Sequence, residues 1–321
     1  MHSYSMQNDQ GLVLSIVIVN TDGTEDTLNC LESICQAPPS AKFELILIDN
    51  CSSKPVIPQV QARYPLVRTF NSPERQGFAR NYNQGIQEAR GEYVMILNND
   101  IIVQSGAFDA LLNCMQETPS YGMVGPKLVS LNGQIQSTCA RSFVTPGRYV
   151  LLQLFLDPGF PMGRLWERFK SWKLSQKKTG VVQCISGACM MTTSEVINSV
   201  GMLDEDYDFY FEDIEWCHRF FNHGMQVVYI AEAEITHLGD RSLRKVREWG
   251  KRSEFLSALR YFREYHGLTM SMARLIWFSS LVGYIIRAAA FWIKGVFSKE
   301  QGYAPEYWRL TKWIINQYPH E

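Results

Sequence analysis

The chain has 321 residues, a formal net charge of −1 and a hydrophobic content of 46%. This length suits one large domain or two closely associated ones, and the near-neutral charge argues against a nucleic-acid-binding protein. The charge is unevenly distributed: residues 1–240 carry 17 Lys and Arg against 26 Asp and Glu, whereas residues 241–321 carry 14 against 6. Such a basic C-terminal region predicts contact with an anionic surface.

The eight cysteines include no CxxC pair and lie within apolar or helical runs, as small core residues do. The N-terminal residues 1–10 lack the apolar run of a signal peptide. We therefore predict a protein of the reducing cytoplasm, without a disulfide framework or a structural zinc site.

Strands and helices are predicted to alternate through the first hundred residues. Short apolar runs rich in branched residues predict strands at 12–19, 43–48, 66–70 and 92–97. Helices are predicted at 24–37 and 76–90, with a short helix or loop at 55–64. Gly91 is well placed for a left-handed helix cap. This alternation predicts right-handed βαβ units and a mostly parallel sheet.

Three of these strands end in polar residues, which are Asn20 and Asp22, then Asp49 and Asn50, then Asn98, Asn99 and Asp100. The carboxyl ends of parallel strands meet at one edge of the sheet, where open α/β sheets bind their ligands. A carboxylate at this edge can hold a divalent cation, and the cation can hold a diphosphate. No GxGxxG follows the first strand, which argues against a dinucleotide-binding dehydrogenase. The absence of a cation in residues 20–24 argues against a nucleotidyltransferase.

The second half of the chain is more mixed. Strands are predicted at 124–129 and 134–143, joined by a hairpin turn at Asn132-Gly133, and at 181–192, interrupted by Ser186-Gly187. A helix over 213–221 and strands over 226–230 and 234–237 follow.

An acidic segment over residues 204–219 carries the aromatic residues Tyr207, Phe209, Tyr210 and Phe211 between its carboxylates. A solvated acidic face would not alternate with aromatic residues in this way. The pattern therefore predicts a lined pocket that holds a general base.

Two basic regions favour membrane contact. Residues 149–178 combine an apolar patch with a basic, tryptophan-containing amphipathic pattern, typical of a membrane-surface helix or of a helix packed on the core. Residues 241–263 carry eight Lys and Arg, and the uncharged run Leu275–Ile286 that follows is shorter than the roughly 20 residues needed to cross a bilayer. We predict interfacial helices flanked by basic residues, with a hydrophobic dimer interface as the alternative.

In this order and spacing, the segments resemble family 2 glycosyltransferases of the GT-A fold, and most of all the bacterial rhamnosyltransferases. The resemblance runs from Leu14 to about His237 through LSIVIVN, ELILIDNCS, NSPERQGFARNYNQGI, GEYVMILNND, MVGPKL, SGACMMTTSEVINSVGMLDEDYDFYFEDIEWCHR and ITHLGDRS. It implies a Rossmann-like, mostly parallel central sheet flanked by helices over residues 1–240. The nucleotide-binding half would span about 12–103 and the acceptor half about 104–240. A basic, helical, membrane-associating region would follow over 241–321.

The resemblance also implies an inverting transfer of a sugar from a nucleotide diphosphate. The donor would be bound by Asn20, Asp49, Asn50, Gly77, Asn83, Asn98 and Asn99. Asp100 and His237 would ligate Mg²⁺ or Mn²⁺, although a histidine at this position could equally be a core residue. Asp213 would deprotonate the acceptor hydroxyl, supported by Glu212. Asn98 stands where the family's DxD motif has its first aspartate, which implies a modest metal affinity.

The rhamnosyltransferase branch favours dTDP-L-rhamnose as the donor. The implied acceptor is a glycan or lipid-linked saccharide of cell-surface polysaccharide synthesis, at the inner face of the cell membrane. Two alternatives stay open: transfer of another hexose from a UDP-sugar, and a catalytically silent sugar-nucleotide-binding protein. A homodimer through the C-terminal helices is a further expectation.

Overall fold

The computed structural model describes residues 11–155, 178–239, 247–297 and 303–319. It divides into two compact units. The first is built from the residues up to Ser142, from a segment that ends at Asp208 and from a segment that begins at Glu212. The second contains the C-terminal helices, part of the chain after Phe143 and the short segment Phe209–Phe211. The predicted division at residue 240 stays a prediction.

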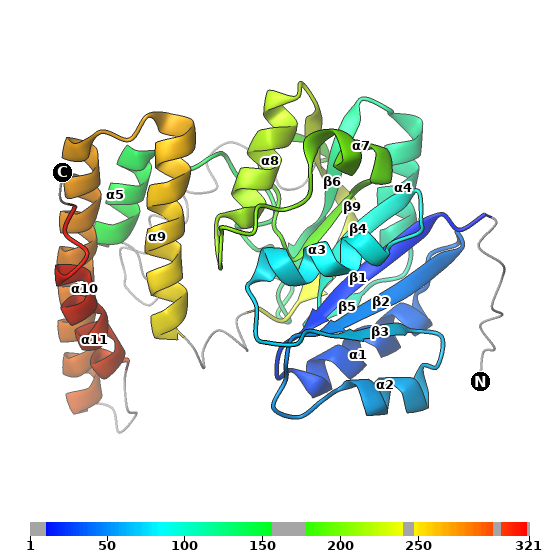
Figure 1. Ribbon diagram of the computed structural model, residues 1–321, viewed down its shortest axis with the longest axis horizontal. Coiled ribbons are helices and arrows are strands. Elements are labelled where there is room, and N and C mark those ends of the chain that lie inside the picture. The colour runs from blue at the N-terminus through cyan, green and yellow to red at the C-terminus, as the bar shows by residue number, and fades with distance from the viewer. Residues whose placement is uncertain (1–10, 156–177, 240–246, 298–302, 320–321) are drawn as a thin grey trace. The chain divides into compact units, whose positions relative to one another are not determined.

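The first unit contains a nine-stranded sheet (Figure 1). Its strands are β1 Leu14–Asn20, β2 Phe43–Asp49, β3 Arg68–Asn71, β4 Tyr93–Asn98, β5 Ile101–Val103, β6 Tyr121–Val129, β7 Gly180–Val182, β8 Cys189–Thr193 and β9 Gln226–His237. The strand order is β3-β2-β1-β4-β8-β6-β9-β5, with β7 also paired to β9.

The N-terminal half of the sheet, β3-β2-β1-β4, is parallel throughout, as predicted. The helices α1 Thr24–Gln36, α2 Ile57–Arg63 and α3 Phe78–Glu88 make the crossovers. In Figure 1, α1 and α2 lie below β1–β3 and α3 lies above them, which leaves β1 buried along almost its whole length.

Two glycines set how closely the chain packs in this half. An added Cβ at Gly85 in α3 would lie 2.1 Å from Cγ1 of Val17, so this glycine allows α3 to rest directly on β1. The prediction that Gly91 caps α3 in the left-handed conformation is wrong. The helix ends with the extended residue Ala89 as its C-cap, and Gly91 is instead needed because a Cβ there would lie 2.7 Å from the backbone nitrogen of Ser15.

The other half of the sheet is mixed. Strand β8 runs antiparallel to both β4 and β6, β6 is parallel to β9, and β5 is antiparallel to β9. The helices here are α4 Ala107–Glu117, α7 Ser194–Val200 and α8 Glu212–Asn222. The predicted strand at 134–143 is wrong: within this segment only Ile135 and Arg141 form isolated bridges, Ile135 to Val129 and Arg141 to Cys184, so the segment meets two separate partners instead of pairing along one strand. The two short strands predicted over 226–237 are one strand, β9.

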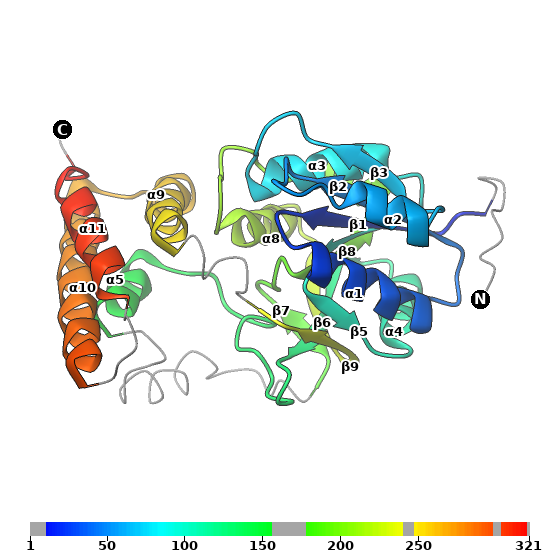
Figure 2. The same cartoon turned by 90° about the horizontal axis from the view of Figure 1, so that it is seen from below.

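The second unit is helical and consists of α5 Pro146–Phe155, α9 Arg247–His266, α10 Met270–Phe297 and α11 Ala304–Ile315. Helices α10 and α11 lie side by side in both views (Figure 1 and Figure 2). Helix α5 approaches α10 at Gly283, where a Cβ would lie 2.2 Å from the carbonyl oxygen of Gln153. That carbonyl also accepts a hydrogen bond of 2.6 Å from Arg287. The predicted amphipathic helix after residue 155 lies outside the described residues.

Helix α10 is longer than the uncharged run in the sequence suggests. Among the described residues, its segment Met270–Gly295 is the one helix long and apolar enough to cross a membrane, with a mean hydropathy of 1.5. The buried Arg287 lies within it. That this region lies on the membrane surface stays a prediction.

Candidate functional site

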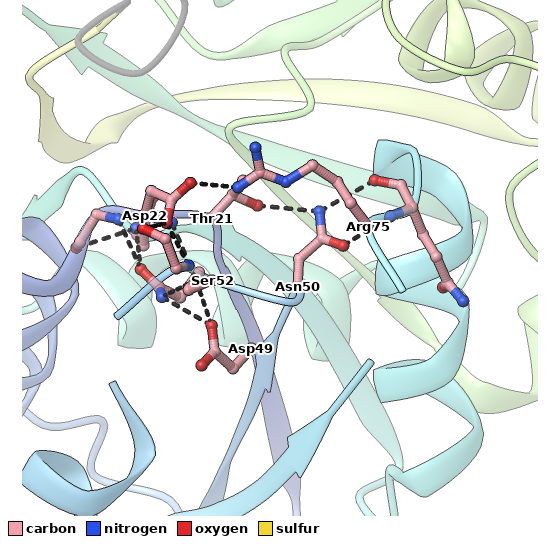
Figure 3. Close-up of polar contacts among 11 residues, drawn as sticks. Thr21, Asp22, Asp49, Asn50, Ser52 and Arg75 are labelled. Carbon is pink, nitrogen blue, oxygen red and sulfur yellow. Dashed lines mark hydrogen bonds and ion pairs between the residues drawn. The ribbon is translucent and has the colours of Figure 1, made fainter. Parts of the chain in front are cut away.

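The ends of β1 and β2 are joined by a buried hydrogen-bond network (Figure 3). Asn20 and Asp49 are opposite each other in the parallel register, which brings their side chains together. Nδ2 of Asn20 donates to Oδ1 of Asp49 over 3.0 Å and to Oγ of Ser52 over 2.9 Å. Asp49 also accepts from the hydroxyl of Ser52 and, at 3.3 Å, from the backbone N–H of Val56. The carboxylate is therefore held in one orientation at the strand end.

Strand β4 joins the same network through the Asn98-Asn99-Asp100 turn. Nδ2 of Asn99 donates to Oδ1 of Asn20 over 3.3 Å and to Oγ1 of Thr27 over 2.9 Å. Oδ1 of Asn98 accepts from the hydroxyl of Tyr82 over 3.1 Å. The polar residues predicted to converge from three strand ends are thus brought together.

Asn50 connects the end of β2 to the loop before α3. Its Nδ2 donates to Oγ1 of Thr21 and to the carbonyl of Gln76, both over 3.0 Å, and its Oδ1 accepts from the N–H of Gln76 over 2.8 Å. Beside it, Arg75 pairs with Asp22 (Figure 3). Hydrogen bonds from Arg75 and Ser53 lower the pKa of Asp22 to about 2. The sequence analysis did not single out Arg75.

The structure places Gly77 and Asn83 against the segment that precedes α8. A Cβ at Gly77 would lie 2.5 Å from the carbonyl oxygen of Asp208, so glycine allows the start of α3 to approach that segment. Asn83 is buried, donates to the carbonyl of Leu203 over 2.8 Å and accepts from its N–H over 3.1 Å. These bonds tie Asn83 to residue 203 rather than to the strand-end network, and its nucleotide-binding role stays a prediction.

Asp100 and His237 lie next to each other because β5, which follows Asp100, pairs with the end of β9. Nε2 of His237 is 3.3 Å from Oδ1 of Asp100, and both side chains are largely buried. A carboxylate oxygen and an imidazole nitrogen are both common ligands of divalent metals, so the pair fits two positions of a Mg²⁺ or Mn²⁺ site. No cluster of three or more His, Cys, Asp or Glu suited to a metal occurs among the described residues. A divalent metal at this pair would need further ligands of other kinds.

Asp213 lies in the first turn of α8, where a helix N-terminus favours an anion. Its Oδ2 accepts from the N–H of Gly187 over 3.0 Å and pairs with Arg141. Burial opposes the charge on Arg141, but the carboxylate of Asp213 outweighs it and raises the pKa of Arg141. The guanidinium therefore stays charged. The sequence analysis placed Arg141 in a strand and gave it no role.

A short backbone path joins Asp213 to the Asn98-Asn99-Asp100 turn. Gly187 donates to Asp213, and the next residue, Ala188, accepts from the N–H of Asn98 over 2.9 Å. A Cβ at Gly187 would lie 3.2 Å from Cβ of Asp213, so only a small residue allows α8 to approach so closely. The proposed base and the proposed metal ligands thus flank the same strand end.

Glu212 differs from its neighbour. Burial raises the pKa of Glu212 well above the usual value of 4.5, and the charge of Asp213 raises it further. Its Oε2 is buried without a hydrogen-bond partner. Burial therefore favours the protonated form of Glu212, and this residue lacks the ion pair with Arg141 that Asp213 makes.

The aromatic residues of the acidic segment are divided between the two units, and the predicted aromatic lining around a carboxylate stays a prediction. Tyr207 is fully buried in the first unit. Phe211 packs in the helical unit against Tyr149, Tyr261 and Phe262, with ring centroids 5.4–6.2 Å apart. The acidic and aromatic residues alternate where the chain passes from one unit to the other.

Comparison with known proteins gives three results. The family model described as "Glycosyl transferase family 2" matches residues 15–201. The N-acetylglucosaminyl-diphospho-decaprenol L-rhamnosyltransferase of Mycobacterium tuberculosis is 25% identical over 206 residues, which is 60% of this chain and 66% of that protein. The low-salt glycan biosynthesis hexosyltransferase Agl10 of Haloferax volcanii is 26% identical over 210 residues, which is 64% of this chain and 61% of that protein. Each alignment spans less than two thirds of the relative.

A similar fold occurs in a solved structure, the mannosyltransferase PcManGT from Pyrobaculum calidifontis in complex with GDP-Man and Mn²⁺. The TM-score is 0.52 at 14% identity, covering 97% of this chain and 87% of that one. At this identity the likeness concerns the fold, which is of the GT-A type.

Proposed function

Because this chain belongs to glycosyl transferase family 2, we propose that it transfers a sugar from a nucleoside diphosphate to an acceptor hydroxyl with inversion of configuration. The observation that carries the proposal is the arrangement around the end of β4. The strand-end network of Asn20, Asp49 and Asn99 joins it on one side. Asp100, which lies next to His237, follows β4 in the chain, and Asp213 is linked to the end of β4 through Gly187. Inversion requires the base to be apart from the residues that hold the diphosphate, because the base and the leaving group lie on opposite sides of the sugar carbon.

The donor would lie along the carboxyl ends of the parallel strands. Asp49, which Asn20 and Ser52 hold in one orientation, would hydrogen-bond the nucleobase. Asn50 fixes the loop before α3, which would form one wall of the site. Asp100 and His237 would hold a divalent cation, Mg²⁺ or Mn²⁺. When bound, that cation neutralises the charge that develops on the diphosphate leaving group.

The acceptor hydroxyl would be deprotonated by Asp213. The N–H of Gly187 and the guanidinium of Arg141 both bind Oδ2, which leaves Oδ1 to receive the proton. The raised pKa of Glu212 favours its neutral form, which adds no second negative charge that would repel the diphosphate.

Asp213→Asn tests the assignment of the base. We expect donor binding, measured by thermal shift, to be retained, because the amide keeps the shape of the side chain. Sugar transfer should fall by about 10²–10⁴-fold, since loss of a general base has this magnitude. Asp206→Asn, an exposed substitution in the same acidic segment, is the control and should transfer at the parental rate. Unchanged transfer by Asp213→Asn would rule out this residue as the base.

We favour dTDP-L-rhamnose as the donor because the residues at the strand ends resemble rhamnosyltransferases and one relative carries that name. A UDP-hexose is the alternative, since another relative is named a hexosyltransferase. A thermal-shift panel with and without Mn²⁺ separates the two. Stabilisation by dTDP-rhamnose but not by UDP-hexoses supports the first, and the reverse supports the second.

For the acceptor we propose a saccharide or lipid-linked saccharide at the inner membrane surface. Two features support membrane contact: the basic composition of residues 241–321 and the apolar residues exposed along α10. The name of the mycobacterial relative contains a diphospho-decaprenol acceptor, which supports a lipid-linked substrate. Dimerisation through the C-terminal helices is the competing explanation of the same apolar surface.

A further inference from the structure

Gln136 reaches His237 because the chain reverses after β6. The turn is made by Ser130–Gly133, with the N–H of Ser130 donating to the carbonyl of Gln134 over 2.9 Å. On the returning arm, the N–H of Gln136 donates to the carbonyl of Leu128 over 2.8 Å. Strand β9 runs beside β6, with Thr236 opposite Val129. The side chain of Gln136 therefore lies next to the last residue of β9.

The amide of Gln136 binds His237 at two points. Its Nε2 donates to the backbone carbonyl of His237 over 2.8 Å, and its Oε1 is 2.8 Å from Nδ1 of the ring. An amide nitrogen can only donate and an amide oxygen can only accept. Since the backbone carbonyl needs a donor, Nε2 must face it, and Oε1 is left for the ring. Nδ1 of His237 must then carry a proton.

This arrangement determines what faces Asp100. With the proton on Nδ1, the neutral imidazole presents a bare lone pair on Nε2, 3.3 Å from Oδ1 of Asp100. Two acceptors directed at each other in a largely buried place repel, and either a proton shared by them or a cation bound by both removes the repulsion. The same ring with its proton on Nε2 would instead hydrogen-bond Asp100 and offer no metal ligand.

We propose that Gln136 is a positioning residue of the metal site, which selects the Nδ1-protonated form of His237 and directs Nε2 to a divalent cation shared with Asp100. This inference rests on the proposed function. Histidines that bind metals commonly donate their second N–H to an oxygen acceptor, and loss of that acceptor typically weakens metal binding by about 10–100-fold. A neutral amide polarises the imidazole less than a carboxylate would, which suits a cation of modest affinity.

The test is Mn²⁺ binding to the purified full-length protein without a donor, measured by electron paramagnetic resonance. Gln136→Leu should raise the Kd for Mn²⁺ by about 10–100-fold. Gln134→Leu, an exposed substitution in the same hairpin, should leave it unchanged. His237→Ala should weaken binding at least as much as Gln136→Leu. Gln136→Glu keeps an oxygen acceptor for Nδ1 and should bind Mn²⁺ no more weakly than the parent.

Nitrogen-15 NMR of histidine-labelled, metal-free protein supplies a readout that a merely structural role would not change. The neutral ring of His237, identified by its loss in His237→Ala, should be protonated on Nδ1 in the parent and should show the Nε2-protonated form in Gln136→Leu. A neutral parent ring protonated on Nε2 would overturn the inference.

Different results would contradict the proposed metal site and the proposed role of Gln136. Parental Mn²⁺ binding that is unaffected by His237→Ala contradicts the proposed metal site itself. A Kd for Gln136→Leu within twofold of the parent, with His237→Ala impaired, contradicts only the role of Gln136. If Gln136→Glu and Gln136→Leu weaken Mn²⁺ binding equally, the proposed role of Gln136 is also contradicted. The hydrogen bond from Nε2 to the backbone carbonyl of His237 would then be the important one.

Discussion

Glu212 and Asp213 are neighbours in the chain, yet their carboxyl groups meet different partners. Asp213 is bound by Arg141 and Gly187, whereas Oε2 of Glu212 is buried without a hydrogen-bond partner. The helix N-terminus that both residues share cannot explain the difference. Arg141, which comes from a different part of the chain, pairs with Asp213, whereas burial raises the pKa of Glu212.

The raised pKa of Glu212 predicts a pH-dependent stability. Its folded pKa lies above the unfolded value of 4.5, so its contribution is fully present below pH 4.5 and is lost as the pH rises toward the folded pKa. The loss amounts to at most about 1.4 kcal/mol per pH unit. Glu212→Gln resembles the protonated form and should remove this loss. The free energy of unfolding of the variant should therefore exceed that of the parent by more at pH 8 than at pH 5. Urea unfolding at several pH values measures it.

Glu195→Gln is the control for that experiment, because Glu195 is exposed on α7 and the same chemical change should have no pH-dependent effect. A difference between Glu212→Gln and the parent that is the same at pH 5 and at pH 8 would contradict a protonated Glu212.

The pair of Arg141 and Asp213 should behave as a partly buried ion pair, with side chains 23% and 13% exposed. Arg141→Met leaves the carboxylate without its charged partner and should lower the free energy of unfolding by about 3 kcal/mol, at the low end for such pairs. Combining it with Asp213→Asn should cost less than the sum of the two single changes, because no unpaired charge is left. Urea unfolding of the four proteins in the cycle measures the coupling.

The exposed pair of Arg80 and Glu205, with side chains 52% and 41% exposed, serves as the reference. Its cycle of Arg80→Met and Glu205→Gln should give a coupling below about 1 kcal/mol. Equal coupling in the two cycles would mean that Arg141 does not hold Asp213 electrostatically.

The strand-end residues could be predicted because each follows an apolar run directly, so the local pattern marks both the strand and its end. Arg141 and Gln136 could not. Their partners Asp213 and His237 are 72 and 101 residues away, and the segment that carries both was predicted to be a strand. In the structure that segment bridges Val129 through Ile135 and Cys184 through Arg141, and no local pattern in the sequence marks these contacts.

Among the elements, α3 lies directly against β1 at Gly85. Gly85→Ala should improve helix propensity by up to about 1 kcal/mol, but the new methyl group would lie 2.1 Å from Cγ1 of Val17 in a buried strand. Val17 is branched at Cβ and cannot easily rotate away, so overpacking should dominate. We expect a net loss of about 1–2 kcal/mol in the free energy of unfolding, measured by urea denaturation.

Gly147→Ala is the matched control, because Gly147 is also helical and nothing lies within 4 Å of its added Cβ. It should be neutral or slightly stabilising. A Gly85→Ala protein as stable as the parent would show that α3 can move away from β1 at little cost.

The positions of the strands in the parallel half of the sheet could be predicted from the sequence, because each strand there is an apolar run between two turn signals. The mixed half was harder. Strand β9 has small residues at Ala231 and Ala233 among its branched ones, and the sequence analysis split it there. In the structure β9 runs on through residues 231–233, where its register with β6 shifts, and it pairs with β6, β5 and β7 on either side of them. Such pairings join residues too far apart in the chain to be evident from local patterns.

For the whole molecule, the apolar side of α10 predicts membrane attachment. Leu275, Phe278, Ile285, Trp292 and Ile293 recur at helical spacing and are exposed. Phe278→Glu and Trp292→Glu should each weaken binding to anionic phospholipid vesicles about tenfold or more, since burial of one such side chain contributes roughly 1.5–3 kcal/mol. Vesicle co-sedimentation at fixed ionic strength measures the partitioning.

Phe221→Glu provides the control, because Phe221 is equally exposed but lies on α8 of the other unit. If α10 forms a dimer interface instead, the two α10 substitutions will change the mass measured by light scattering and leave vesicle binding as it was.

The three residues Phe209–Phe211 limit how this protein can be divided. The chain enters the helical unit at α5, again at Phe209–Phe211 and finally at α9, and the second visit ends one residue before Glu212. A truncation at residue 240 would strip Phe211 of its neighbours Tyr261 and Phe262. A chimaera with a relative must therefore exchange all three segments as a set, and a graft of the C-terminal helices alone should yield an insoluble product.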